Sequence, residues 1–259
     1  MPKYRFSYTV ISESKLHIEK LREYFSDKAK IGVSGLEDFY KSKDPNISDS
    51  AIYWRIRTLV DKNVLQRIGH GQYTLGSQDI FKPTPDKFQS RLFVEIKKEF
   101  PYSELCIWNT SVFNEFMTHQ PFLFYTIVET EDVSKTNIFY HIQNRGESVF
   151  FSDDVNMIDR YSNSKNKIVI VKALITEAPV QQVDDIDTIT LEKALVDLIC
   201  DVDLFSAYQG KERNTIFKEA FNKYTINQSK LLRYAGRRGK RIELEEYLKK
   251  LQLLAVKNN

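Results

Sequence analysis

A nuclease site would need acidic side chains grouped with a lysine around a metal ion, and one region of the chain offers these residue types. The candidates in this acidic middle region are Glu129, Glu131, Asp153, Asp154 and Lys172. Their spacing matches no arrangement typical of nucleases. The pair Asp153-Asp154 and the stretch Asp184-Asp185-Ile186-Asp187 fit solvated loop charges or helix N-terminal anions better. We therefore expect no catalytic residues, with a metal-dependent nuclease as the less favoured alternative.

The histidines and cysteines form no metal-binding pattern. The four histidines, His17, His70, His119 and His141, lie far apart, and the sequence contains neither CxxC nor HExxH. It also lacks the Walker A, GxGxxG and GxSxG motifs. Cys106 and Cys200 lie in apolar surroundings, as reduced core cysteines of a cytoplasmic protein would. The sequence predicts no metal, no cofactor and a non-catalytic protein.

A basic segment near the C-terminus is a candidate binding surface. Its sequence, KLLRYAGRRGKR, places six cations in twelve residues: Lys230, Arg233, Arg237, Arg238, Lys240 and Arg241. Arginine forks suit carboxylate or phosphate partners, and the interleaved Tyr234, Gly236 and Gly239 would allow close approach of a backbone. A solvated helix end, whose cations favour the helix dipole, is the alternative. We interpret the segment as a surface for an acidic protein or for nucleic acid.

The stretch from Ser48 to Leu75 predicts a helix that leads directly into a two-stranded hairpin. Ser48 is a suitable N-cap, because its hydroxyl can accept a hydrogen bond from an amide of the first turn. Ile52, Ile56, Leu59 and Val60 recur at helical spacing and predict one buried face. Gly69-His70-Gly71 supplies a permissive turn between the two strands.

The opposite face of this helix carries polar and aromatic side chains that suit a polyanion. In the DNA-binding interpretation the helix enters the major groove, and the hairpin touches phosphate or the minor groove. If the segment were only part of an ordinary small α+β domain, its aromatic residues would be core or interface residues. The predicted DNA contacts are Ser48, Ser50, Tyr53, Trp54 and Arg57 on the helix, and Arg67, His70 and Gln72 on the hairpin.

Composition and charge place these candidates in an ordinary water-soluble chain of 259 residues. Hydrophobic residues make up 42% of it, and no apolar run is long enough to span a bilayer. The N-terminus lacks the apolar core of a secretory signal, so we expect a cytoplasmic protein. Residues 81–210 hold 12 Lys/Arg against 20 Asp/Glu, whereas residues 211–259 hold 13 against 5. A basic end behind an acidic middle is the strongest compositional signal.

The expected elements give an α/β (α+β) protein of two domains. Residues 1–80 predict helices over 14–26, 34–41 and from Ser48, followed by the hairpin, which is the order of a winged helix-turn-helix. Thr84-Pro85-Asp86 marks the linker to a larger α/β domain, residues 81–259. This domain is expected to have a small sheet region at about 100–180 and a helical region at 190–259. Its predicted helices are 87–100, 111–117, 132–144, 190–200, 205–223, 229–238 and 242–256, and its predicted strands are 105–108, 122–128, 149–151 and 167–175.

Two stretches resemble the AbiEi-type antitoxins of bacterial type IV toxin–antitoxin systems. The first is IYWRIRTLVDKNVLQRIGHGQYTL, which is similar to the family's run from a recognition helix into the wing. The second is TLEKALVDLICD followed by FNKYTINQSKLLRYAGRRGKR, which resembles a Glu-Lys-Ala-Leu-x-Asp helix ahead of a Tyr-Ala-x-Arg-Arg-like turn. Asn63 stands where many such wings have glycine, and asparagine tolerates the left-handed backbone that such a position requires.

The resemblance implies a protein with two roles. Residues 48–73 would bind operator DNA and repress the protein's own operon. Residues 230–241 would contribute to countering a nucleotidyltransferase-like toxin, without a stable complex between the two proteins. We therefore expect a DNA-binding transcriptional autorepressor and antitoxin. A ligand-sensing winged-helix regulator without a toxin is the main alternative.

Overall fold

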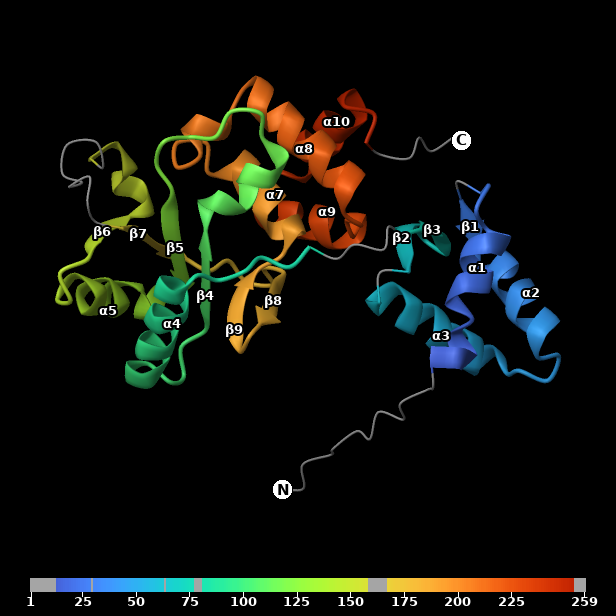
Figure 1. Ribbon diagram of the computed structural model, residues 1–259. Coiled ribbons are helices and arrows are strands. Elements are labelled where there is room, and N and C mark those ends of the chain that lie inside the picture. Colours follow the sequence, from blue (N-terminus) through green and yellow to red (C-terminus); the bar gives the residue numbers. More distant parts are fainter. Residues whose placement is uncertain (1–12, 29, 63, 77–80, 158–166, 254–259) are drawn as a thin grey trace. The chain divides into compact units, whose positions relative to one another are not determined.

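The chain divides into two compact units, residues 1–78 and residues 79–259. The computed structural model (Figure 1) describes residues 13–28, 30–62, 64–76, 81–157 and 167–253. The linker predicted at Thr84-Pro85-Asp86 lies a few residues beyond the division. No helix within these described ranges is long and apolar enough to cross a membrane.

In the described part of the N-terminal unit (residues 1–78), three α-helices pack against a three-stranded antiparallel sheet. Its sheet has the strand order β1-β3-β2. The elements are η1 (Glu13–Leu16), α1 (Ile18–Tyr24), β1 (Ile31–Gly32), α2 (Val33–Lys43), α3 (Asp49–Asp61), β2 (Leu65–Gly69) and β3 (Gln72–Leu75). One hydrophobic core joins them, drawn from every helix and from the sheet. Within this core the buried Tyr40 hydroxyl donates a hydrogen bond of 2.9 Å to the Leu16 carbonyl.

Two details of this unit differ from the prediction. The helix expected over 14–26 is interrupted at His17, which has a left-handed backbone (φ 51°, ψ 41°) and separates η1 from α1. Strand β1 was not predicted, because two residues carry no readable alternation. It pairs with β3 through Ile31 opposite Tyr73.

Helix α3 and the hairpin follow the predicted pattern. The Ser48 side chain accepts a hydrogen bond from the Ala51 amide at 3.3 Å and caps α3. Ile52, Ile56 and Leu59 are buried on its inner face. At the tip of the β2–β3 hairpin, Gly71 has a φ of 64°, a conformation that glycine adopts without strain.

The C-terminal unit (residues 79–259) is built around a four-stranded mixed sheet in the order β4-β5-β7-β6. Strand β4 (Leu105–Asn109) pairs antiparallel with β5 (Tyr125–Thr130), while β7 (Ile168–Ala173) is parallel to both β5 and β6 (Ser148–Phe151). The predicted small sheet of at least four strands is therefore confirmed. The strand expected over 122–128 begins only at Tyr125, and the Phe122 side chain is 97% exposed.

Helices cover both faces of this sheet (Figure 1). Alternate strand residues serve opposite layers, because successive side chains of a strand point to opposite faces. Ile107 and Val128 pack toward α4 (Lys87–Glu99) and α5 (Asp132–Gln143), whereas Trp108 and Ile127 pack toward α7 (Leu191–Cys200) and the helices after it. Helix α4 begins with a capping box, in which the Asp86 and Gln89 side chains each accept the other's backbone amide. Short 3-10 segments η2 (Thr110–Phe116) and η3 (Ser152–Met157) follow β4 and β6.

A hairpin that the sequence pattern did not predict precedes α7. Strands β8 (Val180–Val183) and β9 (Ile186–Ile189) pair antiparallel. The two residues between them, Asp184 and Asp185, both have positive φ (49° and 63°), as a type I′ turn requires. These aspartates, interpreted above as loop charges or helix N-terminal anions, are therefore the two turn residues of a hairpin.

The remaining helices form one layer. After α7 come η4 (Ser206–Tyr208), α8 (Lys211–Lys223), α9 (Gln228–Arg237) and α10 (Arg241–Lys250). The helix expected over 205–223 is split at Gly210, whose φ is 67°. The last predicted helix ends at Lys250, and residues 254–256 of that prediction lie outside the described residues.

Candidate functional sites

The predicted DNA-contacting side chains of α3 lie together on its outer face. Ser50, Arg57 and the N-cap Ser48 are exposed, and Tyr53 and Trp54 are 53% and 38% exposed. Since the buried residues of α3 lie on the opposite side, neither aromatic residue belongs to the core. Large aromatic side chains left in water beside an arginine are typical of a surface that binds a partner.

The hairpin presents the other predicted contacts. Arg67, His70 and Gln72 are all exposed. Tyr73 alternates with Gln72 along β3 and is buried in the core of the unit. The hairpin is therefore anchored on one face and polar on the other, with its tip formed by His70 and Gly71.

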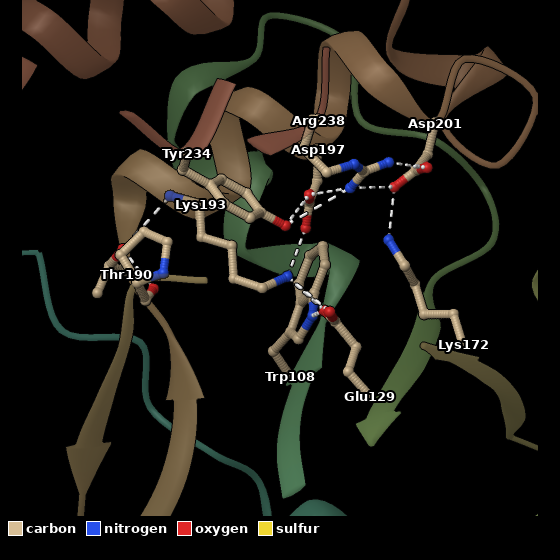
Figure 2. A network of polar contacts seen from close by, with 10 residues as sticks. Trp108, Glu129, Lys172, Thr190, Lys193, Asp197, Asp201, Tyr234 and Arg238 are labelled. Atoms are coloured by element: carbon tan, nitrogen blue, oxygen red, sulfur yellow. Dashed lines mark hydrogen bonds and ion pairs between the residues drawn. The ribbon is translucent and has the colours of Figure 1, made fainter. Parts of the chain in front are cut away.

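A second site, not foreseen in the sequence, is a buried network of charged side chains in the C-terminal unit (Figure 2). Two of its members come from adjacent parallel strands, where Glu129 of β5 lies opposite Lys172 of β7 in the register. Helix α7 contributes Lys193 and Asp197, one turn apart on the same face. Asp201, the C-cap residue of α7, extends the row.

Lys193 is the centre of the network. Its ammonium group donates to Glu129 Oε1 at 2.6 Å, to Glu129 Oε2 at 2.7 Å and to Asp197 Oδ2 at 2.5 Å. All three side chains are wholly buried. The indole Nε1 of Trp108 also donates to Glu129 Oε1, at 2.7 Å. The Lys193 ammonium therefore uses its three hydrogens within the protein.

Helix α9 closes the network from the other side. The Tyr234 hydroxyl donates to Asp197 Oδ1 at 2.8 Å. Arg238, the C-cap residue of α9, donates through Nη1 to Asp197 at 2.7 Å and through Nη2 to Asp201 at 2.6 Å. Lys172 donates to the other oxygen of Asp201 at 2.5 Å.

The network is balanced in charge, which is what allows it to be buried. It contains three cations (Lys172, Lys193 and Arg238) and three carboxylates (Glu129, Asp197 and Asp201). Burial alone would lower the pKa of Lys193, but the Asp197 and Glu129 carboxylates outweigh burial and raise this pKa well above its usual value. Burial alone would raise the pKa of Asp197, but Lys172, Lys193 and Arg238 lower it. The opposite charges around Lys193 and Asp197 thus favour the charged form of each.

This arrangement joins the sheet to the helical layer. Ion pairs run from strands β5 and β7 through α7 to the end of α9. Glu192 adds a further link, because its carboxylate accepts the Asn227 amide at 2.8 Å and so fixes the chain before α9. With the network's charges engaged in these contacts, the arrangement suits a structural role. Among the described residues, no group of three or more His, Cys, Asp or Glu side chains is arranged to hold a metal ion.

Comparison with known protein families assigns the chain to one of them. The model of a family described as a family of unknown function, DUF6577, matches residues 51–253. The chain belongs to the DUF6577 family. No curated protein matches its sequence.

The segment shared with the DUF6577 family begins within α3 and contains the whole charged network. It also includes the predicted DNA contacts from Tyr53 to Gln72, whereas Ser48 and Ser50 precede it. Within the shared segment, the TLEKALVDLICD and KLLRYAGRRGKR stretches meet in space. Asp197, in the first stretch, accepts hydrogen bonds from Tyr234 and Arg238 in the second. Lys193, also in the first stretch, donates to the same Asp197 carboxylate.

The basic segment of this DUF6577 member is largely paired with carboxylates. Arg237 contacts Glu177, Lys240 contacts Glu243 at 2.5 Å, and Arg241 contacts Glu245 at 3.0 Å. Arg238 belongs to the buried network described above. Lys230 and Arg233 are exposed on α9. The six cations therefore do not form one continuous, uncompensated surface.

The acidic residues weighed for nuclease chemistry are dispersed. Glu129 and Lys172 enter the network, but Glu131 instead accepts the Glu104 amide at 2.7 Å. Asp153 and Asp154 lie exposed on η3, where Asp153 accepts the Ser152 hydroxyl. One signal in the sequence pointed to the network. Helix α7 places Lys193 and Asp197 at positions i and i+4 within a run that is apolar apart from these two residues and Glu192, and buried charges at that spacing require partners.

Proposed function

We propose that the chain is a DNA-binding transcriptional regulator whose N-terminal unit is a winged helix-turn-helix. The observation that carries the proposal is the outer face of α3, where Tyr53 and Trp54 are exposed beside Arg57. The element order in the N-terminal unit supports it, because α2 and α3 are followed directly by the β2–β3 hairpin.

The proposed contacts divide into two kinds. Ser50, Tyr53, Trp54 and Arg57 would meet base edges in the major groove, where arginine can bond guanine in bidentate fashion. The hairpin residues Arg67, His70 and Gln72 would contact phosphate or the minor groove. The exposed hydroxyl of Ser48 suits a phosphate near the start of α3.

Binding to the DNA upstream of the protein's own gene tests this proposal. Fluorescence anisotropy titrations over a range of salt concentrations would compare wild type with Arg57→Ala and Arg67→Ala. Loss of a base contact at Arg57 should weaken binding by about 1–3 kcal/mol, and loss of a phosphate contact at Arg67 should lower the salt slope by about 1. Arg91→Ala, an exposed arginine of α4, is the matched control. Unchanged titrations for both test variants would refute the assignment.

We further propose that the protein is the antitoxin of a type IV system and represses its own operon. The support is the resemblance of residues 190–201 and 221–241 to AbiEi-type antitoxins, stretches that lie together in the C-terminal unit. In this role the protein counters a nucleotidyltransferase-like toxin without a stable complex. Lys230 and Arg233 are the cations of the basic segment most available to a partner, since both are exposed.

Co-expression with the neighbouring gene tests the antitoxin role. Wild type should restore growth of cells that express an adjacent nucleotidyltransferase, and Lys230→Glu/Arg233→Glu should restore it less. Arg57→Ala should still restore growth when both genes are driven by foreign promoters, because repression is then bypassed. If no such gene adjoins this one, or if wild type fails to rescue, a regulator without a toxin becomes the better description.

A further inference from the structure

A pocket of about 400 Å³ opens in the C-terminal unit, apart from the charged network. It lies where β4 ends and β5 and β7 begin, beside the first turn of α4. A pocket of this volume suits a small metabolite. It is lined by Thr84, Asp86, Gln89, Asn109, Ser111, Phe122, Leu123, Phe124, Thr126, Lys167 and Ile168.

The two amides of the pocket have their oxygens occupied. Gln89 Oε1 accepts the Asp86 amide at 2.6 Å, as part of the capping box of α4. Asn109 Oδ1 accepts the Ser111 amide at 2.9 Å. The orientation of each amide is thereby fixed, and the amide nitrogen is the group left for a ligand.

Thr126 and Lys167 are further donors in the pocket. Thr126 Oγ1 accepts from Asn109 Nδ2 at 3.2 Å, which leaves the threonine hydroxyl hydrogen to donate. Lys167 uses one hydrogen on Asp86 Oδ2, at 2.7 Å, and retains two. Among the lining residues that the structure describes, Asp86 is the only carboxylate. Its two oxygens are engaged, Oδ2 by Lys167 and Oδ1 by the backbone amide of Gln89.

Apolar side chains form the remaining wall. Phe122 is 97% exposed, and Leu123 and Phe124 follow it along the chain. An exposed phenylalanine beside a group of hydrogen-bond donors can pack against the apolar part of a ligand whose acceptor atoms meet the donors.

We propose that this pocket binds a small organic acid, with its carboxylate on Gln89, Asn109, Thr126 and Lys167 and its apolar or aromatic body against Phe122. Carboxylate oxygens are acceptors only, so they match a wall of donors. The inference does not rest on DNA binding, since every residue it uses lies in the C-terminal unit.

Isothermal titration calorimetry of the full-length protein tests the proposal. The probes are benzoate, phenylacetate and hexanoate at millimolar concentrations, with benzamide and benzylamine as uncharged and cationic counterparts of benzoate. At least one of the three carboxylates should bind saturably and at least tenfold more tightly than benzamide. Benzylamine should not bind.

Two substitutions test the site itself. Gln89→Glu keeps the oxygen that accepts the Asp86 amide in the capping box, but it replaces the amide donor by a negative charge, in addition to that of Asp86. Asn109→Asp likewise keeps the acceptor for the Ser111 amide and replaces its donor by a negative charge. Each should weaken carboxylate binding at least tenfold. Gln143→Glu, at an exposed position of α5 in the same unit, adds the same charge and should leave binding unchanged.

Circular dichroism of each variant establishes that it is folded before titration, and either pocket variant alone is sufficient for the test. Absence of saturable binding by all three carboxylates would overturn the proposal. So would binding of benzamide as tightly as benzoate, or equal binding by Gln89→Glu, Asn109→Asp and wild type.

Discussion

Replacing Lys193 with methionine removes the central cation of the buried network while keeping a long side chain in its place. Glu129 and Asp197 then lose their contacts of 2.6, 2.7 and 2.5 Å to the ammonium group. Both carboxylates stay wholly buried. Removal of one partner from a buried ion pair costs about 3–5 kcal/mol, a large part of the roughly 5–15 kcal/mol by which a domain is stable.

The two carboxylates that lose the Lys193 ammonium are not equivalent. Asp197 keeps the Tyr234 hydroxyl and the Arg238 guanidinium, whereas Glu129 keeps only the Trp108 indole among the network's donors. A second change, Glu129→Gln, removes the unpaired negative charge and keeps a side-chain oxygen that can accept the hydrogen bond from the Trp108 indole. The double variant should therefore recover about 1–3 kcal/mol relative to Lys193→Met.

Denaturant unfolding followed by tryptophan fluorescence measures these energies. The chain has two tryptophans, so a Trp54→Phe background leaves Trp108, inside the network, as the only reporter. Lys98→Met, at an exposed position of α4, is the control and should change stability by less than about 0.5 kcal/mol. A cost below about 1 kcal/mol for Lys193→Met, or a double variant less stable than the single one, would refute the reasoning.

Three further predictions concern acid, a helix cap and a turn. The cations around Asp197 outweigh burial and hold the pKa of its carboxyl at about 2 in the folded protein. The stability that this carboxylate contributes is therefore complete above pH ~3.8 and is lost as the pH falls through the folded-state pKa. Circular dichroism during acid titration should show this loss of stability in wild type, and Asp197→Asn should lack the part that Asp197 contributes. Ser48→Ala removes the acceptor for the Ala51 amide and should cost about 0.5–2 kcal/mol in thermal unfolding of the N-terminal unit, with Ser48→Asp close to wild type. Asp185→Gly relieves a left-handed backbone (φ 63°) and should stabilise the C-terminal unit by about 1 kcal/mol in denaturant unfolding, whereas an unchanged midpoint would contradict a strained turn.

The sequence predicted elements whose signals are local. Ser48 acts as the N-cap expected of it, because a cap bonds an amide only a few residues away. The buried face of α3 follows from the spacing of Ile52, Ile56 and Leu59 for the same reason. These features depend on neighbours within one or two turns.

The errors arise where the decisive partner is distant or the signal is ambiguous. Phe122 is apolar and adjoins a strand, so its exposure could not be read from pattern alone. Asp184 and Asp185 are exposed loop charges, as one of the two interpretations held, but the hairpin that they connect was not predicted, although aspartate tolerates the positive φ of a tight turn. Arg238 was grouped with a basic surface, because its partner Asp197 lies more than thirty residues away on another helix.

The charged network also has a consequence for synthesis on the ribosome. Glu129 and Lys172 are made before their ion-pair partners, Lys193 and Asp201, and Arg238 follows later still. At typical elongation rates of about 5–20 residues per second, roughly 5–20 s pass between residues 129 and 238. The N-terminal unit, which draws its core from its own residues, can fold during that time. The C-terminal unit can complete its charge balance only after α9 has left the ribosome.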